Sequence, residues 1–156
     1  MKYIPLSQGK QAIVDDDLYE SLSGYRWFVN NGYARCWDGS GRGRKIILMH
    51  RVILNTPEGL CTDHINGDRL DNRRENLRVC TKAENSRNRG VEKTNTSGFK
   101  GVNWHKRDRV WQARLNYLGK FIWLGSYKTK EEAALAYNRG AIELHGEFAC
   151  LNEVEC

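Results

Sequence analysis

The sequence lacks the features of a secreted or membrane-inserted protein. It has no apolar N-terminal stretch that resembles a signal peptide, and no apolar run long enough to span a membrane. Its five cysteines are an odd number and form no Cys-x-x-Cys pair. We therefore expect a reduced protein of the cytoplasm with no membrane partner.

Two interpretations of the cysteines stay open. Cys36, Cys61 and Cys80 could hold a structural zinc ion, or they could be ordinary buried thiols. We favour buried thiols because no short cysteine pair of the usual zinc-binding kind is present.

Acidic residues are scarce in one long segment of the chain. From Lys93 to Lys130 there are nine Lys or Arg residues and a single acid, Asp108. From Glu131 onward there are six Glu and one Arg, and the whole chain has a formal net charge of +6. Basic residues concentrated in one segment, next to an acidic segment, indicate that one surface of the protein binds a polyanion such as nucleic acid.

Residues with catalytic chemistry gather in a single polar run. Asp63 and His64 open this run, and Asn76 and Asn85 follow. Asp63 and Asn85 offer oxygen ligands for a hard cation such as Mg²⁺, and His64 is a candidate general base for a water nucleophile. Taken singly, the Asp and Asn residues are typical of turns and caps. Their joint order predicts a one-metal site that cleaves phosphodiesters.

Local signals predict a hairpin and a helix around these residues. Leu60 to Asp63 is expected as one strand, and Asn76 to Thr81 as the returning strand, with an Asn-Gly turn between them. Thr81 and Glu84 form a capping box, which predicts a helix start at Thr81 and puts Asn85 in its first turns. Asn88, one turn later, is the alternative ligand.

The segment before this site predicts short strands and helices. We expect a helix from Asp15 to Leu22 and a hairpin turning at Asn31-Gly32. The stretch Asp38 to Lys45 is glycine-rich and basic, so it is either a mobile phosphate-contacting loop or a plain solvated loop. Residues 46–54 predict a strand running into a short buried helix, where His50 either lines the cleft or has a structural role.

The segment after the site predicts a small sheet with one helix. We expect a linker at 91–96, and then strands from Lys100 to His105, Val110 to Tyr117 and Lys120 to Tyr127. A second capping box at Thr129 and Glu132 begins a helix with a face of small residues, which Gly146 closes. The expected domains are therefore 1–90 and 97–156.

The stretch TDHINGDRLDNRRENLRV, with the earlier LMHRVIL and the later ENSRN, resembles the phage and intron-encoded HNH endonucleases. This resemblance implies a ββα-metal fold in which Asp63 and Asn85 hold one Mg²⁺ or Mn²⁺ ion per site and His64 is the general base. It also implies that Asn76 braces the loop between the strands through backbone hydrogen bonds. The chain has Asp-His where other branches have His-His, and its oxygen ligands favour magnesium or manganese over zinc.

From Ser97 to Asn152 the chain resembles the plant ethylene-response-factor (apetala-type) DNA-binding domain, on the pieces SGFKGVNW, VWQARL, KFIWLGSY and KEEAALAYNRGAIELHGE. That family reads the major groove with one face of its sheet. The matching positions are Lys100, Asn103, His105, Arg107, Arg109, Arg114, Asn116, Trp123 and Tyr137. Phe121 stands at a position that is charged in plant members, so the plant target sequence is not carried over.

Several arginines surround the first site. Arg73 and Arg74 are candidates for contacts to flanking phosphates, although Asp71 and Glu75 could pair with them instead.

Together these patterns predict an α+β protein of two small domains: a ββα-metal HNH nuclease domain, then a three-stranded antiparallel sheet packed on one helix. The expected function is metal-dependent, site-selective cleavage of double-stranded DNA, of the homing-endonuclease type and with nicking favoured. The expected location is the host cytoplasm if a bacteriophage encodes the chain. No small-molecule cofactor is expected, and a monomer is slightly favoured. The alternatives are a non-catalytic DNA-binding regulator and an intron-associated RNA-binding protein.

Overall fold

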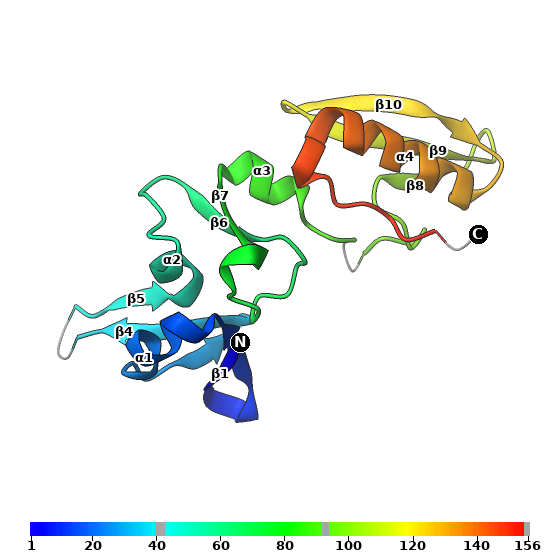
Figure 1. Ribbon diagram of the computed structural model, residues 1–156. Coiled ribbons are helices and arrows are strands. Elements are labelled where there is room, and N and C mark those ends of the chain that lie inside the picture. The colour runs from blue at the N-terminus through cyan, green and yellow to red at the C-terminus, as the bar shows by residue number, and fades with distance from the viewer. Residues whose placement is uncertain (40–42, 92–93, 155–156) are drawn as a thin grey trace. The chain divides into compact units, whose positions relative to one another are not determined.

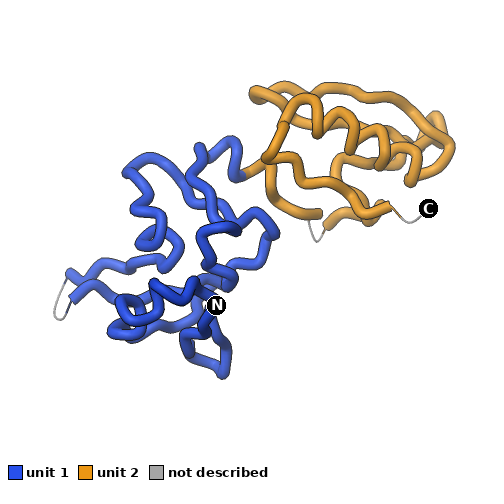
Figure 2. The backbone as a smooth tube through the Cα atoms, in the orientation of Figure 1, with its two compact units in different colours: residues 1–85 blue, residues 86–156 orange. Residues whose placement is uncertain are grey.

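The computed structural model describes residues 1–39, 43–91 and 94–154. The chain forms two compact units, Met1–Asn85 and Ser86–Cys156, which Figure 2 shows in blue and orange. The middle of the predicted basic loop, residues 40–42, and part of the predicted linker, residues 92–93, lie outside the described residues. None of the helices in the described parts of the chain has the length and apolar character needed to cross a membrane.

The first unit begins with two small antiparallel sheets and two short helices (Figure 1). One sheet pairs β1 (Lys2–Pro5) with β2 (Gln11–Val14), and the other has the order β3 (Phe28–Asn30), β4 (Tyr33–Asp38), β5 (Lys45–Leu48). The helices are α1 (Tyr19–Ser23) and α2 (Met49–Ile53).

The predicted hairpin between β3 and β4 is confirmed. Asn31 and Gly32 both have positive φ, 50° and 80°, as the tightest hairpin turns require. A buried core that includes Val14, Trp27 and Met49 joins these elements. The indole N–H of Trp27 donates to the carbonyl oxygen of Leu22 at 2.7 Å, so this polar group is satisfied inside the core.

The second part of this unit is a hairpin followed by a helix. Strand β6 (Cys61–His64) pairs antiparallel with β7 (Leu77–Cys80), and α3 (Lys82–Arg87) follows. The capping box before α3 is confirmed, because the Thr81 N–H donates to Glu84 Oε2 at 2.8 Å and the Glu84 N–H donates to Thr81 Oγ1 at 3.3 Å. Strand β6 begins and ends one residue later than the predicted strand from Leu60 to Asp63, so it includes His64.

The second unit is a three-stranded antiparallel sheet with one long helix on it. The strands are β8 (Val102–His105), β9 (Val110–Tyr117) and β10 (Lys120–Tyr127), in the order β10-β9-β8, and the helix is α4 (Lys130–His145). Figure 1 shows α4 lying along one face of this sheet. The mixture of helices and antiparallel strands in both units makes the fold α+β, as predicted.

Small residues let α4 lie close to the sheet. A Cβ on Gly140 would lie 2.8 Å from a methyl carbon of Leu124, and a Cβ on Gly101 would lie 2.2 Å from the Tyr137 ring. The expected DNA-facing position of Tyr137 is therefore wrong: this side chain is 2% exposed and lies in the core between helix and sheet. Burial raises the pKa of its hydroxyl to about 12.

Candidate active site

Asp63 and His64 lie next to each other at the end of β6. Both side chains are buried, with 5% of each residue exposed. In the ladder Asp63 lies opposite Arg78, and His64 lies opposite Leu77. Neighbouring residues of a strand point to opposite faces, so the two side chains have different surroundings.

The carboxylate of Asp63 forms an ion pair with its cross-strand neighbour. Arg78 donates to Asp63 Oδ2 from Nη2 at 2.7 Å and from Nε at 2.9 Å. Both side chains of this pair are largely buried. The Asp63 carboxylate therefore already has a cationic group at hydrogen-bonding distance.

The imidazole of His64 meets an amide oxygen. Its Nε2 lies 3.3 Å from Oδ1 of Asn72, a residue of the loop between β6 and β7. Burial lowers the pKa of His64 below its usual 6.5, although the hydrogen bond to Asn72 and the charge of Asp63 act in the opposite direction. The lowered pKa favours a neutral ring at pH 7, as a general base requires.

A second histidine packs against this ring. The rings of His50 and His64 are nearly perpendicular, at 87°, with centroids 5.0 Å apart. The ring of Tyr33, from β4, lies 5.3 Å from His50 and 6.0 Å from His64. Burial is the main cause that lowers the pKa of His50 to about 3. The structure thus places His50 against His64 at the candidate site, which agrees with the first of the two roles that the sequence left open for it.

Asn76 holds both sides of the loop between β6 and β7. Its Oδ1 accepts from the N–H of Asn66 at 3.0 Å, and its Nδ2 donates to the carbonyl oxygen of Asp71 at 2.8 Å. The side chain of Asn66 also donates to Asp71 Oδ2 at 3.2 Å. These bonds fix the loop that carries Asn72.

The other predicted ligands are less closely tied to this site. Asn85 is half-buried in the first turn of α3, where its N–H donates to the carbonyl oxygen of Thr81 at 3.0 Å. Asn88 follows the end of α3 and belongs to the second unit.

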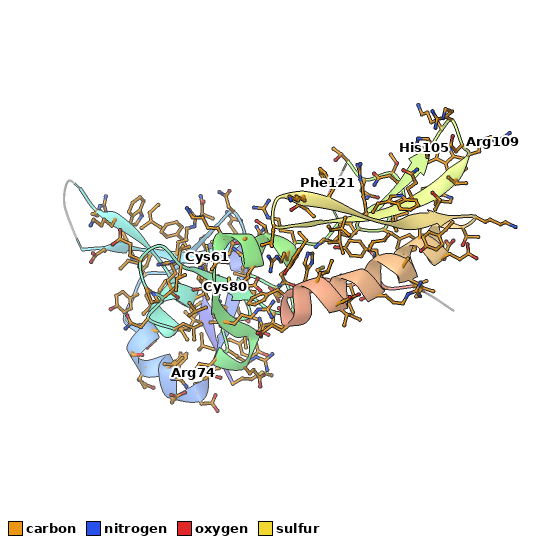
Figure 3. All side chains as sticks on the ribbon, turned by 90° about the horizontal axis from the view of Figure 1, so that it is seen from above. Cys61, Arg74, Cys80, His105, Arg109 and Phe121 are labelled. Atoms are coloured by element: carbon orange, nitrogen blue, oxygen red, sulfur yellow. The ribbon has the colours of Figure 1, made fainter. Side chains whose placement is uncertain are left out.

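Three cysteines do not come together as a zinc site. Within residues 1–39, 43–91 and 94–154, no group of three or more His, Cys, Asp or Glu side chains could hold a metal ion. Cys61 and Cys80 lie opposite each other on β6 and β7, side by side in Figure 3, whereas Cys36 is in the core of the first part of the unit. All three are free thiols, and burial raises the pKa of Cys80 to about 11.

The arginines proposed for flanking phosphates are paired with carboxylates. Arg73 donates to Asp71 from Nη2 at 2.7 Å and from Nε at 2.8 Å, and it also contacts Glu75. Arg74, labelled in Figure 3, donates to Asp17 at 2.7 and 3.0 Å. These contacts favour a structural role for both arginines over phosphate binding.

A second candidate surface is the sheet face of the second unit that does not contact α4. The exposed side chains on or beside this face are those of Asn103, Arg114, Asn116, Phe121 and Trp123. Phe121 and Trp123 are 72% and 66% exposed, which is unusual for such large apolar groups. The Arg114 guanidinium lies 5.2 Å from the centroid of the Phe121 ring, so the aromatic ring helps to hold this cation on the face.

The turn from β8 to β9 carries three further predicted DNA contacts. Figure 3 shows His105 and Arg109 at this end of the sheet, and Arg109 has a positive φ of 53°. Asp108 accepts from Arg107 Nε at 2.8 Å and lies 3.2 Å from His105 Nδ1. The charge of Arg107 is therefore partly neutralised by Asp108, the single acid of the basic segment.

Lys100 is turned away from this surface. Its ammonium donates to the backbone carbonyl oxygens of Arg87 and Arg89, and burial lowers its pKa. These contacts favour a role in holding the chain after α3, not in binding DNA.

Comparison with known proteins agrees with this geometry. The family model "HNH endonuclease" matches residues 55–87, which include β6, the loop, β7 and α3. An uncharacterized HNH endonuclease of Acanthamoeba polyphaga mimivirus, L560, is 31% identical over 150 residues, or 95% of this chain and 78% of that protein. The chain belongs to the HNH endonuclease family. Protein 3.8 of Escherichia phage T7 is 40% identical over 93 residues, which are 60% of this chain and 76% of that protein.

This HNH protein is also similar over part of its length to plant transcription factors. The ethylene-responsive transcription factor WRI1 of Arabidopsis thaliana is 33% identical over 103 residues, which are 65% of this chain and 23% of that protein. The chain thus combines an HNH part with an apetala-type DNA-binding part. Tyr33 and His50 lie outside the segment that the HNH family model matches, so that model does not include them in the site.

Proposed function

We propose that the protein is a metal-dependent endonuclease that nicks double-stranded DNA at selected sites. The catalytic element is β6, β7 and α3, which would act as a ββα-metal unit. The observation that supports this most strongly is the adjacent, buried pair Asp63 and His64, whose histidine meets the Asn72 amide in a loop braced by Asn76.

His64 would act as the general base. Burial lowers its pKa, so the ring is largely neutral at pH 7 and can take a proton from the attacking water. General-base action is typically worth about 10²–10⁴-fold in rate. Asn76 would act indirectly, by holding the loop on which the orientation of His64 depends.

The donor set of the site fits a magnesium or manganese ion. Asp63 supplies a carboxylate and Asn85 an amide oxygen, and Mg²⁺ is commonly held by one or two protein groups together with water and phosphate oxygens. The guanidinium of Arg78 already lies 2.7 Å from the Asp63 carboxylate, so this position attracts positive charge. When bound, the ion would neutralise charge on the scissile phosphate and the leaving 3′ oxygen.

The experiment is cleavage of supercoiled DNA in the presence of Mg²⁺, with and without a chelator. We expect open circles with the wild-type protein, and a loss of about 10²–10⁴-fold in rate for His64→Ala, with DNA binding retained. Glu20→Gln, an exposed change on α1, is the matched control. Cleavage by His64→Ala at the wild-type rate would show that another group is the base. Linear product would indicate a dimer or paired sites.

The sheet of the second unit would read the DNA sequence. Arg114 and Asn116 suit the edges of guanine and adenine, and Phe121 suits the methyl group of thymine. Trp123 adds an exposed aromatic surface, and Asn103, His105, Arg107 and Arg109 would complete the interface. Cations on this surface would supply a salt-dependent phosphate contribution.

Selection of binding sites from random DNA tests this assignment. Arg114→Ala should relax the preference at one base pair by roughly 5- to 150-fold, the value of a good bidentate contact. Glu143→Gln, on the exposed side of α4, is the control. Replacing thymine by deoxyuridine in the selected site should weaken binding of the wild-type protein but not of Phe121→Ala. An unchanged preference in both variants would show that another surface reads the sequence.

A further inference from the structure

The hydrogen bonds of Asn72 determine which ring nitrogen of His64 carries the proton. Asn72 is completely buried, with 0% exposed, and its backbone is fixed from another strand. Its N–H donates to the carbonyl oxygen of Ile13, and the N–H of Ile13 donates to the carbonyl oxygen of Leu70, both at 2.8 Å. Ile13 belongs to β2, so a strand of the first sheet positions the loop of the candidate site.

The side chain of Asn72 has one possible orientation. Its Nδ2 donates to the carbonyl oxygen of Leu70 at 3.1 Å, so the amide oxygen Oδ1 is the atom that faces His64 Nε2. An amide oxygen only accepts hydrogen bonds. His64 must therefore carry its ring proton on Nε2, and in the neutral ring the lone pair that can accept a proton lies on Nδ1.

The neighbouring rings oppose rotation of this imidazole. His50, from α2, stands nearly perpendicular to it at 5.0 Å, and Tyr33, from β4, lies 6.0 Å away. A half-turn of the ring about its bond to Cβ would move the proton-bearing nitrogen away from Asn72 and turn the ring within this packed group. The ring plane and the tautomer are thus held by different elements.

We propose that Asn72 is a positioning residue that fixes His64 as the Nε2–H tautomer, so that Nδ1 receives the proton of the attacking water. This inference rests on the proposed role of His64 as general base. Asn72 does not touch the reacting atoms itself. Residues outside the matched HNH segment, Ile13 and His50, support the arrangement.

The direct test is ¹⁵N NMR of the histidine rings in the full chain, at a pH where His64 is neutral. The signal of His64 is assigned by its loss in His64→Ala. The wild-type protein should show a protonated Nε2 and an unprotonated Nδ1. Asn72→Leu removes the acceptor and should give a mixture of tautomers, whereas Asn72→Asp keeps an acceptor at the same place and should retain the wild-type tautomer. A proton on Nδ1 in the wild-type protein would overturn the proposal.

The kinetic test separates positioning from folding. Asn72→Leu should lower kcat about 10²-fold with little change in KM, because a residue with no exposed surface does not bind DNA. Asn72→Asp should recover most of kcat, and an unchanged kcat in Asn72→Leu would refute the role. If Asn72→Leu does not fold, the proposal is still tested by the tautomer of His64 in the wild-type protein and by the tautomer and kcat of Asn72→Asp. A different result is that neither the wild-type protein nor the variants cleave DNA, although the His64 tautomer still changes in Asn72→Leu. In that case Asn72 does position the ring, and the proposed nuclease function is wrong.

Discussion

His50 should make the first unit sensitive to acid. The side chain is buried in α2, and its Nδ1 is a buried atom with no hydrogen-bond partner among the residues that the structure describes. Burial is the largest cause that lowers its pKa to about 3, and the charges of His64, Arg51 and Arg35 act in the same direction. Protonation of His50 is therefore much less favourable in the folded unit than in the unfolded chain.

The direction and size of the effect follow from the two pKa values. In the unfolded chain a histidine titrates near 6.5, whereas His50 in the folded chain titrates near 3. Stability is therefore fully present above pH 6.5 and is lost as the pH falls from there toward 3. At about pH 4.5, two pH units at about 1.4 kcal/mol each give a loss of about 3 kcal/mol from this residue.

The variant His50→Phe removes the titrating group and keeps a ring of similar shape. The free energy of unfolding should be measured by urea titration at about pH 7 and about pH 4.5, following the indole N–H of Trp27 by NMR. This group is buried and bonded to the carbonyl oxygen of Leu22, so it reports on the first unit alone. The loss of stability between the two pH values should be about 2–3 kcal/mol smaller in His50→Phe than in the wild-type protein.

The comparison isolates His50, because His64 and the carboxylates remain in both proteins. His105→Phe, in the second unit, is the control, and it should leave the pH dependence of the Trp27 transition unchanged. Equal losses in wild-type and His50→Phe would refute the reasoning, since they would mean that His50 is protonated or exposed to water in the folded unit.

Three further predictions concern single contacts. Arg78→Leu removes the cation 2.7 Å from the buried Asp63 carboxylate, so urea unfolding should show a loss of about 2–3 kcal/mol, part of which Mg²⁺ restores if Asp63 binds the ion. Gly101→Ala should lower the unfolding free energy of the second unit by about 3 kcal/mol, because the position has a φ of 72° and its Cβ would lie 2.2 Å from the Tyr137 ring. Thr129→Ala should cost about 1 kcal/mol in the same measurement, by removing the oxygen that accepts from the Glu132 N–H at 3.2 Å.

Local chemistry explains why much of the fold was predictable. β9 ends and β10 begins where the sequence predicts, because Leu118-Gly119 supplies two positive-φ positions, 50° and 77°, at the turn between them. Capping boxes at Thr81 and Thr129 identify the starts of α3 and α4 in the same way. These signals depend on residues within a few positions of one another.

The pairing of Arg73 with Asp71 and Glu75 is one of the alternatives that the sequence offered. The use of Arg74 and Lys100 was not predictable, because their partners are distant in sequence or lie on the backbone. Arg74 pairs with Asp17, 57 residues earlier, and Lys100 donates to backbone carbonyl oxygens after α3. Neither partner is visible in a pattern of charges. The basic composition therefore indicates the class of ligand, a polyanion, but not which side chains would contact it.

Contacts between residues that are distant in sequence also determine how much of the chain the nuclease needs. The matched HNH segment, residues 55–87, contains the pair Asp63 and His64 but not β2, β4 or α2. Asn72 takes its position from Ile13, and the ring of His64 packs against His50. A chain limited to the matched segment would keep the order of the proposed catalytic residues and lose the elements that orient the proposed base. The functional nuclease is therefore expected to need the whole first unit, because the proposed chemistry depends on the direction of the His64 ring as much as on its presence.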